Sequence, residues 1–171
     1  MKRLQPRIIT ITLLLLGLGV VAAQAEPQFS GAWVLDRAQS QFPAHNRQQG
    51  PDAQAPPPVI TLTVEQQGTT LKVTRTRTMG THARSTTDTL IADGTDQSRR
   101  GYGGEIVTRA AFEGDRLVVT QTHVKKSEQG DRTMSRQSTW TLSPDGRVLT
   151  IDTTMHGPRG DHAMRTVYQR S

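Results

Sequence analysis

The chain has 171 residues, no cysteine and a formal net charge of +6, and 33% of its residues are hydrophobic. Its length fits one domain. The lack of cysteine excludes disulfides, thiolate metal sites and thiol chemistry.

Residues 1–25 have the three parts of a cleavable secretory signal peptide. Lys2, Arg3 and Arg7 form a positive start, residues 8–21 are almost wholly apolar, and residues 23–25 read Ala-Gln-Ala. The apolar run of about 14 residues is shorter than the ~20 that a spanning helix needs. We therefore expect cleavage after Ala25 rather than a retained anchor. The mature protein is then periplasmic or secreted, without stable membrane insertion.

Cleavage also changes the charge of the protein. It removes three basic residues and leaves 18 basic and 15 acidic ones, a net charge of +3 for residues 26–171. This charge is ordinary for a small soluble domain. We therefore expect no nucleic-acid partner.

The mature chain predicts an all-β domain, because long helical periodicity is missing and turn residues recur at strand-length spacing. The first strand is expected at residues 30–36. A long irregular stretch follows at residues 37–58 and includes Pro56-Pro57-Pro58, which cannot pair as a central strand. A loop of this length is typically functional or mobile.

Eight further strands are separated mostly by short turns, with a second irregular stretch at residues 92–104. Short connections force neighbouring strands to be antiparallel. An open sheet would leave two exposed edges, which closure removes. We therefore predict an antiparallel up-and-down meander of eight or nine strands that closes into a barrel, rather than a two-sheet sandwich. The eight further strands are expected at residues 59–66, 70–79, 82–91, 105–112, 116–126, 132–142, 147–155 and 162–170.

Three short segments resemble a known family. The Gly31-Ala32-Trp33 motif at the start of the first strand resembles the lipocalins and the wider calycin group. The segments 29–36, 114–119 and 142–150 resemble small exported bacterial lipocalin-like proteins of unknown function. The resemblance implies that Trp33 closes the bottom of the barrel and stacks against an arginine of the last strand. Arg165 or Arg170 is implied for this role, and we assign Arg165.

Motifs for catalysis are missing. The sequence contains neither a Gly-x-Ser-x-Gly nor a His-Glu-x-x-His pattern. His123, His156 and His162 are expected near one rim and could bind zinc or copper, although their spacing is typical of solvated turns. We therefore assign no catalytic residue, no metal and no cofactor.

Polar residues on the inward face are more informative. Alternation from Leu71 continues to Arg75 and Arg77, and the next strand places Arg84 and Asp88 on the inward face. A buried, unpaired guanidinium is costly. These arginines must therefore meet Asp88, water or an anionic ligand.

This pattern leads to the hypothesis of a cavity for a small molecule with an apolar body and an acidic head. Trp33 and Trp140 are expected to fill the core, and Trp140 also to line the cavity. The alternative is a β-bulge near Arg75, which would turn the arginines outward onto a solvated surface.

Three functions follow in order of preference. The first is a binding protein for a small amphipathic or anionic ligand, with no catalytic step. The second is a cell-envelope protein-interaction or stress-associated module, and the third is an enzyme with its site at the barrel mouth. An enclosed cavity of at least ~300 Å³ would favour the first function, whereas a barrel filled by its own side chains would favour the second.

Overall fold

The computed structural model describes residues 26–43, 57–101, 104–126, 130–157 and 160–171. The predicted signal peptide and most of the predicted loop at residues 37–58 lie outside these residues. Among the described residues, no helix is long and apolar enough to cross a membrane. The described residues form ten strands: β1 (Gly31–Gln41), β2 (Val59–Gln67), β3 (Thr70–Met79), β4 (His82–Ile91), β5 (Asp93–Gly101), β6 (Gly104–Glu113), β7 (Arg116–Lys125), β8 (Arg132–Leu142), β9 (Val148–His156) and β10 (His162–Arg170).

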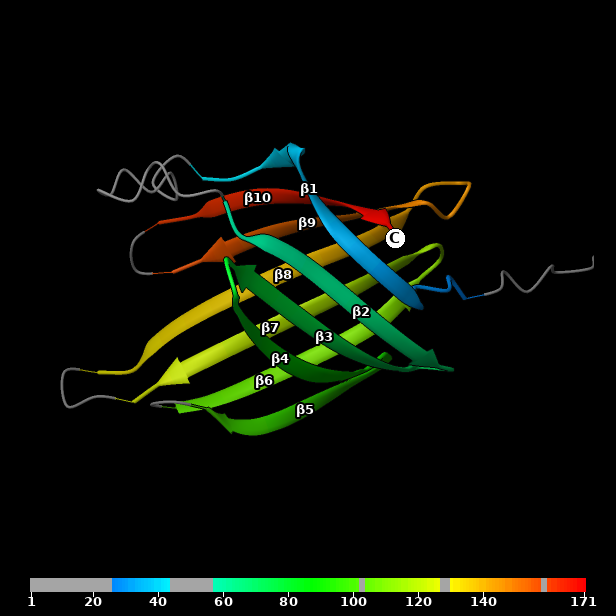
Figure 1. Ribbon diagram of the computed structural model, residues 1–171. Helices are drawn as coiled ribbons and strands as arrows, with labels where there is room; N and C mark the ends of the chain where they lie inside the picture. The colour runs from blue at the N-terminus through cyan, green and yellow to red at the C-terminus, as the bar shows by residue number, and fades with distance from the viewer. Residues whose placement is uncertain (1–25, 44–56, 102–103, 127–129, 158–159) are drawn as a thin grey trace, which may run out of the picture.

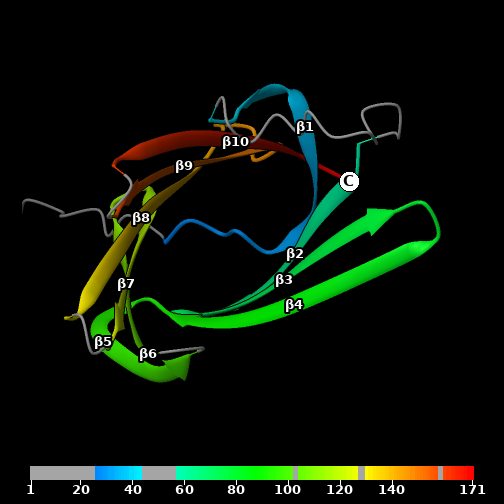
Figure 2. The same ribbon diagram turned by 90° about the vertical axis from the view of Figure 1, so that its left-hand side faces the viewer.

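The strands form one antiparallel sheet in the order β4-β3-β2-β1-β10-β9-β8-β7-β6-β5. Strands that are consecutive in the sequence pair with each other, with the exception of β4 and β5, which form the two ends of the sheet. The first strand, β1, also pairs with the last, β10. The sheet curls into a nearly closed barrel with a seam between β4 and β5 (Figure 1; Figure 2). The predicted antiparallel meander is therefore confirmed.

The strand count differs from the prediction because β5 occupies most of the stretch at residues 92–104, which was predicted to be irregular. The segment Asp93–Gly101 contains no large apolar residue, so it lacks the alternation that marks a half-buried strand. It is an end strand whose partner is β6 alone. Tertiary pairing, rather than its own sequence, makes it a strand.

Strand β1 also runs further than residues 30–36. Its pairing with β10 shifts register between Asp36 and Gln41. The Asp36 carboxylate accepts hydrogen bonds from the backbone N–H groups of Ala38 and Gln39 at 3.0 and 3.1 Å. Ser40 donates to the Asp36 carbonyl and accepts from the Val167 N–H at 3.0 Å. These bonds satisfy the bulged backbone, so the strand continues past Asp36.

The two ends of the barrel differ in composition. The turns β2–β3, β6–β7 and β8–β9 lie at one end, which we call the closed end, and the turns β3–β4, β5–β6, β7–β8 and β9–β10 lie at the other, the mouth. Leu71, Leu117 and Leu149 are each the second residue of a strand that starts at the closed end, and each is fully buried. The apolar core therefore fills the closed end and leaves polar side chains toward the mouth.

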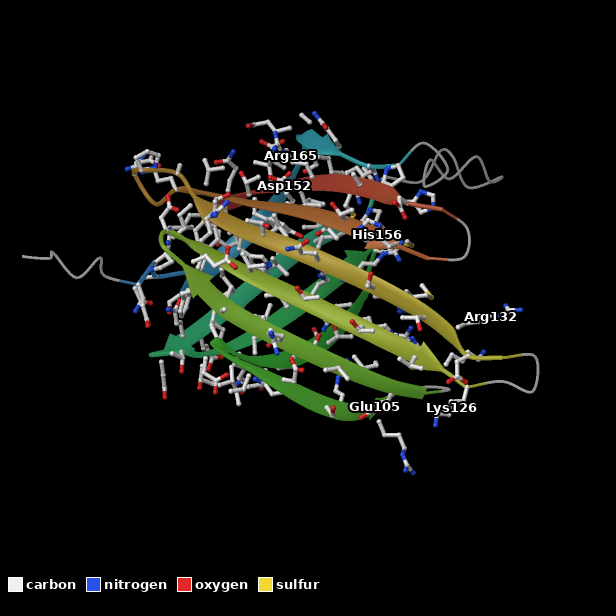
Figure 3. The ribbon with its side chains drawn as sticks, turned by 180° about the vertical axis from the view of Figure 1, so that it is seen from behind. Glu105, Lys126, Arg132, Asp152, His156 and Arg165 are labelled. Atoms are coloured by element: carbon white, nitrogen blue, oxygen red, sulfur yellow. The ribbon has the colours of Figure 1, made fainter. Side chains whose placement is uncertain are left out.

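Trp33 lies in this core and is fully buried. Its indole N–H donates to the Phe29 carbonyl at 3.1 Å, and the Arg170 guanidinium lies 4.2 Å from its ring centroid. The assignment of that stacking to Arg165 is wrong. Arg165 is paired instead with Asp152, at 2.7 Å, on the opposite face of β10 (Figure 3). Arg170 is opposite Trp33 in the β1–β10 register, whereas Arg165 is opposite Gln41.

Candidate functional site

A cavity of about 120 Å³ lies inside the barrel, between the β3–β4 hairpin and strands β7 and β8. Its closed-end side is apolar and its mouth side is polar, which is the arrangement that an amphipathic molecule requires. The lining residues are Val73, Arg75, Thr86, Asp88, Leu90, Val119, Gln121, Arg136, Ser138 and Trp140.

The pairing of β3 places Arg75 on the cavity wall. From Thr70 to Met79, β3 pairs with β2 and β4 without a register shift, so Arg75 stays on the inward face marked by Leu71. The β-bulge considered as an alternative does not occur. Arg77 and Arg84 are directly opposite each other on the same face, closer to the mouth. Neither of them lines the cavity.

Arg136 on β8 is a charged cavity residue that the sequence did not single out. Alternation from buried Trp140 through Ser138 places it inward, so the rule applied to β3 would have found it. Its Nε atom is buried and has no hydrogen-bond partner. Burial lowers the pKa of the Arg136 guanidinium, and the positive charge of Arg75 lowers it further. An arginine remains charged even so, so the cavity holds an under-satisfied cation.

Asp88 was the predicted partner of the inward arginines. It lines the cavity, but its ion pair is with Arg99 on β5, at 3.8 Å between Nη2 and Oδ1. This pair crosses the seam between β4 and β5. It also borders a second hollow of about 70 Å³, which shares Asp88, Leu90 and Gln121 with the first. Asp88 therefore pairs across the seam, and it forms no hydrogen bond with the Arg136 Nε.

Trp140 lies both in the core and on the cavity wall. It is 7% exposed and belongs to the core cluster. The ring of Phe29 meets it edge-on, with centroids 5.9 Å apart, a favourable aromatic geometry. Trp140 also lines the cavity. Trp140 therefore forms part of the apolar wall on the closed-end side of Arg75 and Arg136.

The three histidines do not form a cluster. His156 pairs with Asp161 at 2.9 Å, and His123 has a buried Nε2 atom without a hydrogen-bond partner. Within the parts of the chain that the structure describes, no group of three or more potential ligand side chains could hold a metal ion.

Comparison with known proteins gives a fold rather than a sequence family. No protein-family model matches the chain, and no curated protein sequence matches it. Among solved structures, Caenorhabditis elegans lipid binding protein 8 has a TM-score of 0.52 at 14% identity, covering 84% of this chain and 95% of that one. The fold is that of the calycin-type barrels.

Two further calycin-type structures are similar to the same extent. The zebrafish ileal bile acid-binding protein complexed with cholic acid has a TM-score of 0.51 at 17% identity, covering 84% of this chain and 98% of that one. A mutant of the fluorescent protein UnaG has a TM-score of 0.52 at 17% identity, with 84% and 96% covered. The calycin-type resemblance expected from the Gly31-Ala32-Trp33 motif is therefore confirmed for the fold.

Proposed function

We propose that this barrel is a binding protein for a small molecule with an acidic group, and that it has no catalytic step. The acidic group lies beside Arg136 and Arg75, and an apolar part of the ligand contacts Trp140. The observation that carries the proposal is the buried Arg136 Nε without a partner. A donor on a charged group left unsatisfied in a low-dielectric interior is costly, and an anion would remove that cost.

The charge of the cavity wall supports an anionic ligand. Arg75 and Arg136 both line the cavity, and Asp88, the acidic residue among the lining residues, is paired with Arg99. Guanidinium groups bind carboxylates and phosphates through parallel hydrogen bonds. The lipid-binding and bile-acid-binding proteins named above share the fold, which makes an acidic amphiphile the ligand class to test first.

The size of the cavity limits the ligand. A volume of about 120 Å³ is below the ~300 Å³ that is typical of pockets for drug-sized molecules. The closed end is filled by its own aromatic and aliphatic side chains. We therefore propose a ligand with a short apolar part rather than a long-chain lipid fully enclosed in the barrel.

The test is a titration of the mature chain with octanoate, with octanol as a neutral analogue, followed by calorimetry. We expect octanoate to bind and octanol to bind at least roughly tenfold more weakly, since the alcohol cannot form the charge-assisted hydrogen bonds. Arg136→Gln and Arg75→Gln should each weaken octanoate binding, and the double variant should abolish the difference between the two probes.

Arg165→Gln is the matched control, because Arg165 lies on the outer face and contacts Asp152 rather than the cavity. Equal octanoate affinity for Arg136→Gln and the wild type would rule out the anion site. Native mass spectrometry of the protein isolated from its own source provides a second readout. A co-purifying small acid would identify the ligand.

The small cavity favours a second candidate function, a protein-interaction module of the cell envelope. In that case the barrel serves as a scaffold and the interior binds nothing. The same titration separates the two functions, since failure of every acidic probe, together with an empty protein from its own source, would leave the interaction module.

We further propose that the protein acts outside the inner membrane, after export directed by residues 1–25. The support is the charged, apolar and small-residue pattern of that segment. Mass spectrometry of protein isolated from the periplasm or the medium should give a chain that begins at Glu26. Recovery of the uncleaved chain in the membrane fraction would contradict this.

A further inference from the structure

Most of the exposed large apolar side chains lie around the mouth of the barrel. Of the six large hydrophobic side chains that are exposed in the described part of the chain, four lie at that end: Phe42 after β1, Val59 at the start of β2, Met79 at the end of β3, and Met134 near the start of β8. Val59 and Met134 are 54% and 53% exposed. These four residues come from separate strands, so they are spread around the opening rather than packed together.

Basic side chains surround them. Strand ends and flanking residues at the mouth carry a set of exposed cations: Arg77, Arg84, Arg100, Lys125, Lys126 and Arg132. Figure 3 shows Lys126 and Arg132 at the ends of β7 and β8. We call these six residues, with the four apolar ones, the mouth rim. The acidic residues described at this end are fewer, namely Glu105, Asp131 and Asp161.

The closed end has the opposite character. The exposed charged residues near this end are acidic more often than basic. The acidic ones are Glu26, Glu65, Asp93, Glu113, Asp115 and Asp145, and the basic ones are Lys72, Arg116, Arg147 and Arg170. The described barrel is therefore electrically polarised along its axis, with the positive pole at the mouth. Such a dipole orients a protein in the field of a charged surface.

Cations and apolar tips together are the combination that an anionic bilayer surface recognises. Lys and Arg near such a surface are attracted to acidic headgroups, and apolar side chains enter the boundary between headgroups and acyl chains. An acidic protein surface would complement the cations, but its polar groups would leave the side chains of Met79, Met134 and Val59 without an apolar partner. We propose that the mouth rim docks this protein onto the surface of a membrane that contains anionic phospholipids.

The test is co-sedimentation of the mature chain with vesicles. Vesicles of phosphatidylcholine and phosphatidylglycerol in equal amounts should bind the protein at low salt, and added salt should weaken the binding. Vesicles of phosphatidylcholine alone should bind it far more weakly. No binding to the anionic vesicles, or equal binding to both kinds, overturns the proposal.

Charge variants locate the docking surface. The triple variant Lys125→Gln, Lys126→Gln and Arg132→Gln should lower the partition onto anionic vesicles roughly tenfold or more. The matched closed-end variant Lys72→Gln, Arg116→Gln and Arg147→Gln removes the same charge and should change it less than about twofold. An equal loss of vesicle binding in the two variants would show that net charge alone attracts the protein to the membrane. That result would overturn the proposal that the mouth rim is the docking surface.

Apolar variants test the second component. Met79→Ser with Met134→Ser should weaken vesicle binding several-fold, whereas Val34→Ser with Ile91→Ser should not. Val34 and Ile91 are also exposed, at 36% and 37%, but they lie away from the mouth. Since Lys125, Lys126, Arg132, Met79 and Met134 do not line the cavity, all the rim variants should keep octanoate binding. Failure of the membrane proposal is therefore distinguishable from failure of the proposed ligand site.

Discussion

Arg170 covers the indole of Trp33 and ties together three parts of the closed end. The guanidinium carbon lies 4.2 Å from the ring centroid, Nη1 donates to the Ser30 carbonyl at 2.9 Å, and Nε donates to the Gly146 carbonyl at 2.8 Å. The last strand is thereby joined both to the entry of β1 and to the β8–β9 turn. One side chain thus joins the first and last segments of the barrel.

Replacing Arg170 should destabilise the fold. We expect Arg170→Ala to lower the free energy of unfolding by about 2–3 kcal/mol, from the loss of a cation–π contact and two hydrogen bonds. Arg170→Lys should fall between the alanine variant and the wild type, since lysine lacks the planar fork. Urea unfolding monitored by tryptophan fluorescence measures the change. Arg165→Ala, which breaks only an exposed pair, is the control, and an equal loss there would refute the role of Arg170.

Gly31 should not tolerate a side chain. Its φ of +144° is in a region that other residues rarely adopt, and an added Cβ would collide with the Arg170 guanidinium. Gly31→Ala should therefore lower the free energy of unfolding by about 1–3 kcal/mol. Gly157→Ala has room for its Cβ and should be nearly neutral. When Arg170 is already alanine, Gly31→Ala should lower the free energy of unfolding by less, because the collision is gone and only backbone strain remains. An unchanged loss would show that backbone strain alone causes it.

Replacing Arg136 by an apolar residue should weaken ligand binding and stabilise the ligand-free fold. Arg136→Met replaces a guanidinium whose Nε has no partner by an apolar side chain of similar length. We expect the free energy of unfolding of the ligand-free protein to rise by roughly 1–2 kcal/mol, while octanoate binding is weakened. Arg165→Met should not stabilise, since it removes a charge that is already paired and solvated. A destabilised Arg136→Met variant would mean that the arginine is a structural member of the core.

Low pH should destabilise the β-bulge of β1, because the Asp36 carboxylate that accepts its hydrogen bonds becomes protonated. Hydrogen bonds lower the pKa of this carboxyl, that from the Gln39 backbone N–H first, although its slight desolvation acts in the opposite direction. Because the folded pKa lies below the unfolded value of about 3.9, the stabilisation is complete above that value. It is lost as the pH falls through the folded pKa.

The measurement is the melting temperature of Asp36→Asn against the wild type as a function of pH. The variant should melt lower at neutral pH, and the difference should narrow as the pH drops below about 4. Asp115→Asn, on an exposed turn, serves as the reference. A difference that persists unchanged at low pH would show that the carboxylate charge is not what stabilises the bulge.

Much of this molecule follows from the sequence alone. Period-two alternation, together with the turn residues between strands, located β3, β4 and β8 at their observed bounds. The same alternation placed Arg75 inside the barrel. The same rule, counted along β8 from Trp140, would also have placed Arg136 on the inward face.

The tertiary structure decided what depends on neighbours distant in the sequence. β5 is a strand because β6 offers it a partner, and its own residues carry no apolar signal. Arg170, rather than Arg165, reaches Trp33 because the β1–β10 register sets them opposite each other. Asp88 forms its ion pair across the seam with Arg99 and not with Arg75. Alternation fixes which face a side chain occupies, but only the register and the curvature of the closed sheet fix which side chain it meets.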